Sequence, residues 1–448
     1  MNEKEVIEDW ILKYKKKLMP KNYTHFDRRV SIEKVKFIIG DREKVSKYGF
    51  KPFIHYTQKS KKYDKIKGKK EKKREICYSA HLDRYIYQYY SHKLNDYYNS
   101  YLKKELEETK ENYNIIAYRN ILEKNNINFS KKVIDFLRKK GNSFVIVGDF
   151  TNFFDNLNHK YLKKMLCKVM KMSSLPEDYF NIYKNITRYS VWDLESLLEI
   201  NGLKNTKKDI QLFNKKEKAI LKIEDFDRLK KSNIKINKEK GIPQGSAISA
   251  VLSNIYMIEF DEKMISFINQ NDGLYMRYSD DFIIIIPKEK SENFNRELNK
   301  ILIEIEENIK IIPNLELQKE KTKVFLYSDN EILSFETKNK TFMSYLGFDF
   351  DGKKVSIRGK TISKYYYRMN RKIKTILKNK GITKKGNKIS CQKLYEKYTI
   401  KGIKKGNFIS YVYRATSIFD DKDGKNENIK RDIKNHMKKI RKKLNKIK

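Results

Sequence analysis

Two short apolar runs in the middle of the chain predict β-strands that carry carboxylates. FVIVGD (144–149) is typical of a strand that enters a turn at Asp149, and YMRYSDDFIIII (275–286) places Asp280 and Asp281 inside a strand-like stretch. Adjacent strand residues point to opposite faces, so one carboxylate of this pair would be buried, at a cost of several kcal/mol if unpaired. A tight turn at the pair would instead expose both carboxylates at one place.

Helical periodicity surrounds these strands. It predicts helices in 1–50, after Arg74, at 160–171, after a Gly/Pro-rich turn that begins at 241, at 291–310 and through most of the chain beyond 360. The last of them carries a narrow apolar stripe that we expect to pack on its own domain. SYLGFDFDGKKVSIRG (344–359) predicts a β-hairpin around Asp351-Gly352. Residues 59–74 hold ten Lys or Arg and almost nothing apolar, which predicts an exposed loop.

Charge narrows the range of partners. The 448 residues contain 100 Lys plus Arg against 57 Asp plus Glu, a formal net charge of +43. Such an excess attracts polyanions, so nucleic acid is the first partner to consider and an anionic membrane surface the second. An AT-rich genome would account for part of the Lys excess. The three cysteines have no metal-type spacing, and no apolar run approaches the length of a membrane span, so we expect a cytoplasmic protein.

The carboxylates suggest a chemistry. If the two strands are neighbours, Asp149, Asp280 and Asp281 meet at one end of a sheet, where they repel each other unless cations bind. Two Mg²⁺ ions, which Mn²⁺ could replace, would resolve the conflict, because Mg²⁺ prefers oxygen ligands and leaves room for substrate phosphates. Two such ions support in-line phosphoryl transfer. A basic protein with this site is expected to transfer nucleotides.

Five segments resemble, in order, the palm motifs of reverse transcriptases: FVIVGDFTNFFD, GIPQGSAISAVLSNIYM, YMRYSDDF, LELQKEKTKVF and SYLGFDFDG. The tetrad Tyr278-Ser279-Asp280-Asp281 matches their Y-x-D-D core. The sequence is most similar to bacterial reverse transcriptases of the retron, group II intron and abortive-infection kinds, and among these to the defence-associated group. Maturase and HNH endonuclease features of group II intron proteins are not evident.

The resemblance implies an α+β, right-hand polymerase whose palm is an antiparallel sheet with helices on one face. The expected regions are an N-terminal extension and fingers (1–143), a first palm part (144–173), a fingers/palm insertion (174–240), a second palm part (241–355) and a basic helical thumb (356–448).

The resemblance also assigns roles to single residues. Asp149, Asp280 and Asp281 would be catalytic, and they would bind the metal with the backbone carbonyl of Phe150. The nucleotide would contact Phe154, Gln244, Gly245, Arg119 and Lys321, and the primer and template would contact Tyr278, Gly347 and Phe348. Phe154 would be a steric gate that favours deoxynucleotides, or else a core aromatic. Lys321 would be a general acid on pyrophosphate, or else an ordinary surface lysine.

The implied function is an RNA-directed DNA polymerase that copies a noncoding RNA encoded nearby, in antiphage defence. Its partners would be that RNA, the DNA product and deoxynucleotides, with no membrane; a homo-oligomer is compatible with the sequence. Three alternatives stay open: a template-independent, protein-primed DNA polymerase, an RNA-dependent RNA polymerase, and a catalytically inactive RNA-binding scaffold.

Overall fold

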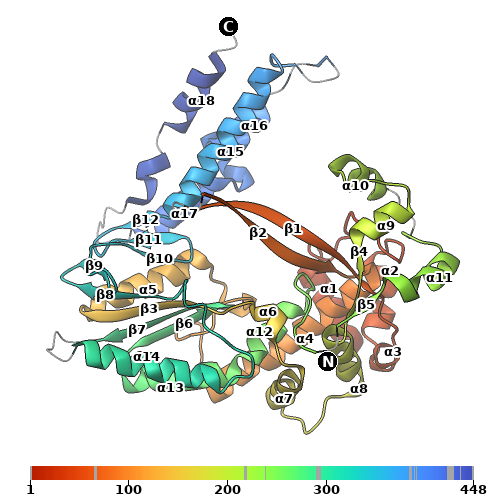
Figure 1. The fold of residues 1–448 in the computed structure, drawn as a ribbon, viewed down its shortest axis with the longest axis horizontal. Helices are drawn as coiled ribbons and strands as arrows, with labels where there is room; N and C mark the ends of the chain where they lie inside the picture. Colours follow the sequence, from red (N-terminus) through yellow and green to blue (C-terminus); the bar gives the residue numbers. More distant parts are fainter. Residues whose placement is uncertain are drawn as a thin grey trace.

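Three β-sheets and the helices around them make up the protein (Figure 1). This computed structural model describes residues 3–445, apart from 65–67, 216–218, 238, 289–293, 383–385, 388, 390, 421–427 and 434. The architecture is α+β, as the sequence predicts. None of the described helices has the length and apolar character needed to cross a membrane.

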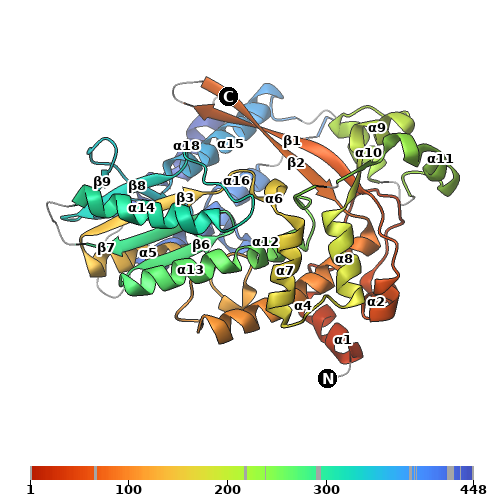
Figure 2. The same cartoon turned by 60° about the horizontal axis from the view of Figure 1, so that its bottom comes forward.

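The largest sheet has five antiparallel strands in the order β6-β7-β3-β8-β9. The strands are β3 (Ser143–Asp149), β6 (Leu274–Tyr278), β7 (Asp281–Pro287), β8 (Lys323–Ser328) and β9 (Glu331–Ser334). Successive isoleucines of β7 enter different apolar cores: Ile284 packs in the core with α13 (Ile258–Gln270) and α14 (Phe294–Lys310), and Ile283 in the core with α5 (Asn126–Lys140). Elements therefore cover both faces of the palm sheet (Figure 2), and the expectation of helices on one face is wrong.

The lysine-rich segment that predicted a loop is a long β-ribbon. The strands β1 (Phe53–Asp64) and β2 (Gly68–Tyr78) pair antiparallel with Gln58 opposite Arg74. The prediction was wrong because both faces of this stretch lack apolar residues, whereas strand pairing needs only backbone donors and acceptors. The ribbon extends toward the thumb helices in both cartoon views (Figures 1 and 2).

The segment 174–240 joins the same sheet. Its strand β4 (Ser190–Asp193) pairs in parallel with β1, and β5 (Lys235–Ile236) pairs with β4. The other elements up to residue 256 are α1 (Glu3–Tyr14), α2 (Ile32–Ile39), α3 (Arg42–Ser46), α4 (His81–Glu105), η1 (Asn120–Leu122), α6 (Phe153–Asn156), α7 (His159–Met170), α8 (Glu177–Thr187), α9 (Leu194–Ile200), α10 (Lys207–Phe213), α11 (Ile223–Asn233) and α12 (Ser249–Tyr256).

A three-stranded sheet connects the palm to the C-terminal helices. It contains β10 (Met343–Tyr345), β11 (Phe348–Phe350) and β12 (Val355–Ile357), and the predicted turn around Asp351-Gly352 joins the last two. The helices are α15 (Gly359–Lys378), α16 (Gln392–Tyr398), η2 (Ile400–Lys405), α17 (Phe408–Phe419), η3 (Asn428–Ile433) and α18 (His436–Leu444). The predicted last helix is thus divided, but its stripe packs on its own domain: Ile429, Ile433 and Ile440 are buried in one core with α15 and α17.

Glycine at one position of the palm sheet allows a close contact. Gly148 lies opposite Phe282 in the β3–β7 pair, and a Cβ atom there would stand 2.2 Å from the Phe282 ring. The ring is fully buried, so it has no free space to move into. The pairing next to Asp149 therefore depends on a residue without a side chain.

We expect Gly148→Ala to lower the free energy of unfolding by roughly 1–3 kcal/mol, because overpacking shifts buried groups from their preferred positions. Urea denaturation of the purified protein measures this. Gly49→Ala is the matched control, since an added Cβ there meets nothing within 4 Å. Equal stability of the two variants would contradict the packing argument.

Candidate active site

Strand register brings the acidic residues together. β3 and β7 are neighbours, and Asp149 stands directly opposite Asp281. Tyr278 pairs with Asp281 across β6 and β7, so Ser279 and Asp280 form a two-residue turn, with Ser279 at a φ of 60°. The pair of acids thus lies where a strand begins, and both carboxylates escape the sheet interior. The predicted convergence of two carboxylate-bearing strands is confirmed.

A buried ion pair holds this turn. Arg277 and Asp261 are both fully buried, with the Arg277 Nη2 donating to Asp261 Oδ2 at 2.6 Å and Nε donating to Oδ1 at 2.8 Å. The Nη1 of Arg277 donates to the backbone carbonyl of Ser279 at 2.9 Å. Charge-assisted, bidentate bonds of this kind fix geometry strongly. Sequence reasoning missed Arg277, although a cation within an otherwise apolar buried strand was a usable signal.

The electrostatics reflect crowded negative charge. Desolvation, followed by the neighbouring Asp280 and Asp149 carboxylates, raises the pKa of Asp281 to about 6, although its side chain remains exposed. Burial, together with Asp149, also raises the pKa of Asp280. The Lys321 Nζ lies 2.7 Å from Asp149 Oδ2 and neutralises part of this charge.

The donor set fits a hard divalent cation. Crowded carboxylates, two of which have a raised pKa, favour a bound cation, and oxygen ligands suit Mg²⁺. Within the described residues, no three His, Cys, Asp or Glu side chains already stand in a metal-binding arrangement. The lysine–carboxylate contact at Asp149 is the interaction that a cation would have to replace. Ligation by these residues and by the Phe150 carbonyl stays a prediction.

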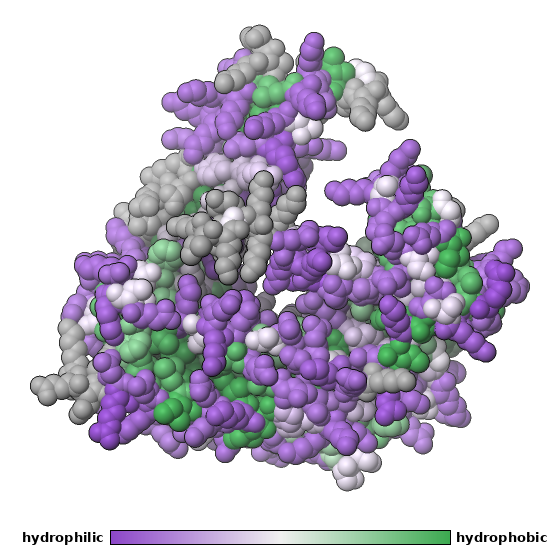
Figure 3. All heavy atoms as spheres, in the orientation of Figure 1, coloured by the Kyte–Doolittle hydropathy of each residue, from purple (hydrophilic) through white to green (hydrophobic). Residues whose placement is uncertain are grey.

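Asp149 and Asp280 line a cavity of about 850 Å³ between the palm, the ribbon and the thumb. Its lining includes three of the predicted nucleotide contacts, Phe154, Gln244 and Lys321. It also includes residues that the sequence did not single out: Lys72, Lys73 and Arg74 of β2, Tyr118, Gln318, and Lys360 of α15. The three β2 cations were missed because their segment predicted a loop. In Figure 3 hydrophilic side chains border the hollow between thumb and fingers.

Phe154 satisfies both interpretations offered for it. It lines the cavity and also packs on the main apolar core. Its backbone carbonyl accepts a hydrogen bond from the Ile242 N–H at 2.9 Å, which places its segment beside the glycine-rich turn. The gate role stays a prediction that depends on which ring face meets the substrate sugar.

The glycine-rich turn docks on the ribbon. The Gln244 carbonyl accepts from the Cys77 N–H at 2.8 Å, and a Cβ on Gly245 would lie 2.5 Å from the Cys77 carbonyl oxygen. Gly245 has a φ of +118°, which also favours glycine. The expected close backbone approach is therefore present, but its partner here is strand β2, and Gly245 is not part of the cavity lining.

Arg119 does not reach the cavity, and its proposed role as a nucleotide clamp is corrected. Its guanidinium is buried, forms an ion pair with buried Glu108, and donates to Asn99 Oδ1 at 2.8 Å and to the Ile115 carbonyl at 2.7 Å. Glu108 in turn accepts from two backbone N–H groups of the loop before Arg119. These bonds occupy the guanidinium within the protein, so it stabilises this loop.

Of the predicted primer-side residues, Tyr278 lies beside the acids, opposite Asp281 in the strand pair. Tyr278 borders the turn, with its ring 6.3 Å from that of Tyr118. Leu346 and Gly347 form a tight turn between β10 and β11, and the Gly347 carbonyl accepts from the Arg358 N–H. Phe348 lies in this hairpin, as expected, but it is 1% exposed and stacks on Tyr411. Of the two hairpin positions, Gly347 is therefore the one on the turn.

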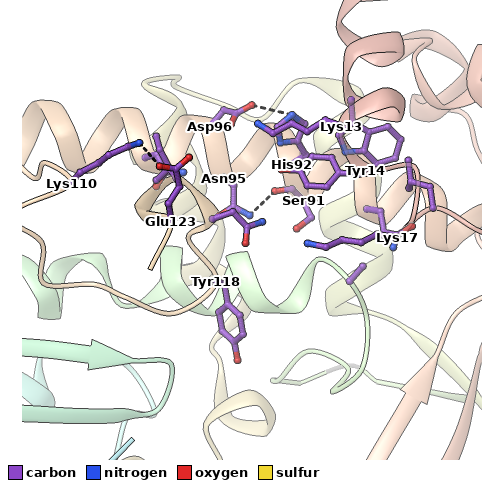
Figure 4. A pocket seen from close by; sticks show the side chains of 17 residues that line it. Lys13, Tyr14, Lys17, Ser91, His92, Asn95, Asp96, Lys110, Tyr118 and Glu123 are labelled. Carbon is purple, nitrogen blue, oxygen red and sulfur yellow. Dashed lines mark hydrogen bonds and ion pairs between the residues drawn. The ribbon is translucent and has the colours of Figure 1, made fainter. Parts of the chain in front are cut away.

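A second cavity, of about 490 Å³, lies along α4 (Figure 4). Tyr118 borders both cavities. Two pairs of charged residues line the second cavity: Lys110 bonds Glu123 at 2.8 Å, and His92 lies 3.6 Å from Asp96. Lys13 and Lys17 also line this second cavity. The first cavity is lined by charges of both signs, because the ribbon and thumb cations stand there beside Glu71, Glu75, Asp155 and Glu320 as well as the catalytic acids.

Comparison with known proteins gives one clear relationship. Residues 61–350 match the family described as reverse transcriptase (RNA-dependent DNA polymerase). Telomerase reverse transcriptase of Tetrahymena thermophila is 27% identical over 126 residues, which span 24% of this chain and 11% of that protein.

The solved structures that are similar include two of apo telomerase from Candida tropicalis. The form truncated from its C-terminal domain has a TM-score of 0.43 at 13% identity and covers 74% of this chain and 61% of its own; the other has a TM-score of 0.41 at 14% identity and covers 94% and 68%. The family match covers well over half of the sequence and includes the motifs that carry the acids. The chain belongs to the reverse transcriptase family.

Proposed function

We propose that the chain is an RNA-directed DNA polymerase that joins deoxynucleotides by two-metal phosphoryl transfer. The observation that carries the proposal is the strand register that brings Asp149, Asp280 and Asp281 together. Asp149 and Asp280 line a cavity to which the ribbon and the thumb also contribute cations. The family match supports the same chemistry.

The acidic and basic residues of the cavity would have different roles in this reaction. The three carboxylates would hold two Mg²⁺ ions, which, when bound, activate the primer hydroxyl and stabilise the leaving oxygen. Lys72, Lys73 and Arg74 would bind the triphosphate from the ribbon side. Lys321, which bonds Asp149 in this structure, would donate its proton to pyrophosphate once a cation replaces it at that carboxylate.

The thumb offers a surface for a nucleic-acid duplex. A groove of about 780 Å³ lies between α15, α16 and η2, and cations dominate its lining: Arg358, Lys360, Lys364, Arg368, Lys393, Lys397 and Lys405. Cations in a row bind phosphates without reading sequence. This groove and the catalytic cavity share Lys360, so a duplex bound by the thumb would place its end at the acids.

The first prediction removes charge and keeps side-chain volume. We expect Asp280→Asn with Asp281→Asn to reduce incorporation of deoxynucleotides on a primed RNA template by several orders of magnitude, because the cations carry most of the charge stabilisation. Primer extension with and without Mg²⁺ measures this. Circular dichroism would check that the fold is kept.

Asp272→Asn is the control for that experiment. This carboxylate is also at the end of a palm hairpin, but its side chain is 83% exposed and it bonds Lys140, away from the cavity. It should retain full activity. Extension by the double variant at the rate of the wild type would reject the assignment of the active site.

The second prediction concerns sugar choice. Phe154→Val would open space beside the incoming ribose, so use of ribonucleotides should rise roughly 10- to 100-fold, about 1.4 to 2.8 kcal/mol of lost discrimination. The measurement is the ratio of kcat/KM for dGTP and GTP on one primed template. Phe342→Val, at an exposed phenylalanine, is the control. An unchanged ratio would assign Phe154 to the core alone.

We further propose that the template is a noncoding RNA encoded beside the gene, copied in antiphage defence. Support comes from the net charge of +43 and from the resemblance to defence-associated enzymes. Purified protein should carry one RNA, whose binding weakens steeply with salt as counterions are released. Sequencing the bound RNA before and after addition of deoxynucleotides tests this. Synthesis without any RNA would instead favour a template-independent enzyme.

A further inference from the structure

We propose that α7 and α8 form a binding platform for single-stranded nucleic acid outside the catalytic cavity. The α7–α8 platform consists of Phe180, Tyr183 and the cations around them, Lys160, Lys163, Lys184 and Arg188. These residues line a hollow of about 650 Å³. Identification of the strand as the unpaired part of a template depends on the proposed function; the binding itself does not.

The platform presents an aromatic surface to solvent. Phe180 is 43% exposed, and its ring stacks on that of Tyr183, with centroids 6.2 Å apart and planes at 30°. The Tyr183 hydroxyl donates to the His159 carbonyl at 2.9 Å, which holds the lower ring in place. A single exposed aromatic residue needs no explanation. A fixed, stacked pair with one ring open can continue the stack with a nucleobase, whatever the base.

Cations surround the rings without carboxylate partners. Among the described residues, Lys160, Lys163, Lys184 and Arg188 form no ion pair, and the Lys163 Nζ lies 5.1 Å from the Phe180 ring centre. Lysines elsewhere on the same helix are paired: Lys164 bonds Glu259 at 3.0 Å and Lys168 bonds Glu262 at 2.7 Å.

Lys164 and Lys168 of α7 are neutralised by glutamates, whereas no described residue neutralises Lys160 and Lys163 of the same helix, so the positive charge is concentrated at the platform. Glu239 is the one acidic residue in the lining of the hollow. Four cations around an open aromatic ring suit a chain that carries both phosphates and bases, which is single-stranded nucleic acid.

The platform is rigidly connected to the catalytic cavity. The segments 154–158 and 240–242 are bonded side by side, with the Gly241 N–H donating to the Leu157 carbonyl at 2.8 Å and Asn158 bridging Lys240. One end of this pair supplies Phe154 to the catalytic cavity, and the other supplies Asn158 to the platform hollow. The His159 ring also bonds the Gly241 carbonyl at 2.8 Å. A strand on the platform would thus be held near the site where its bases are copied.

The test compares two primed RNA templates that differ only in their unpaired 5′ end, a one-nucleotide overhang or an overhang of about twelve nucleotides. Fluorescence anisotropy without deoxynucleotides gives the Kd of each. The wild type should bind the long overhang roughly three- to tenfold more tightly at about 0.1 M salt. Phe180→Ala, and separately Lys163→Ala with Lys184→Ala, should abolish this preference while leaving the Kd for the short overhang unchanged.

Two controls isolate the platform. Lys164→Ala with Lys168→Ala also removes two positive charges, both from α7, and should keep the preference. Phe180→Tyr should keep it because the ring remains. Primer extension on the short-overhang template should be normal in all four variants. Equal binding of both templates by the wild type, or a preference that survives Phe180→Ala, would overturn the proposal. Absence of extension by the wild type on either template would contradict the polymerase assignment and leave the binding result interpretable.

Discussion

Antiparallel pairing of β3 with β7 is the constraint on which the active site depends. Asp149 and Asp281 face each other only in the observed register, and a slip of one residue would turn every side chain of one strand to the opposite face. Apolar burial on both faces of β7 and the contact of Gly148 with Phe282 prevent such a slip. Core packing and carboxylate placement are therefore determined by the same pairing.

The active-site carboxylates and the cations of the ribbon and thumb carry opposite charges, and this contrast relates the site to the rest of the protein. The acids are concentrated at one sheet edge, where desolvation and the neighbouring carboxylates raise the pKa of Asp280 and Asp281, while the ribbon and thumb contribute cations to the cavity and the groove beside them. Without bound ligands, the carboxylates repel one another and so do the cations. Bound metal ions would reduce the repulsion among the carboxylates, and bound phosphates would reduce the repulsion among the cations. Cofactor and substrate would therefore neutralise charge that the protein alone leaves unbalanced.

Sequence reasoning succeeded where local pattern and chemistry coincide. The apolar runs next to Asp149 and Asp281 predicted the strands and the meeting of their carboxylates. The cation site inferred from the mutual repulsion of these carboxylates stays a prediction. The ribbon was missed because its strands have no apolar face. The pairing of segment 174–240 with the ribbon was not predicted, because β4 joins a strand more than a hundred residues earlier. The packing of elements on both faces of the palm sheet could likewise not be predicted from the periodicity of single helices.

Single side chains were harder to place than strands. Arg119 occupies a motif position, but the orientation of its side chain depends on Glu108. This buried carboxylate forms an ion pair with the guanidinium and so keeps it inside the protein. Phe348 belongs to the predicted hairpin, yet alternation along a three-residue strand decides that its ring enters the core. The type and spacing of residues in the sequence do not predict whether such a side chain faces the site or the interior of the protein.

The ion pair of Arg277 with Asp261 has a consequence for the order of folding. Arg277 holds the turn before Asp280, but its partner belongs to α13, a separate element of the chain. Until that helix docks, the guanidinium has no buried counter-charge, and a strand that carries it into the core is strongly disfavoured. The hairpin and the helix must therefore assemble in one cooperative step, and a partly folded chain would not present a finished set of carboxylates to metal or nucleotide.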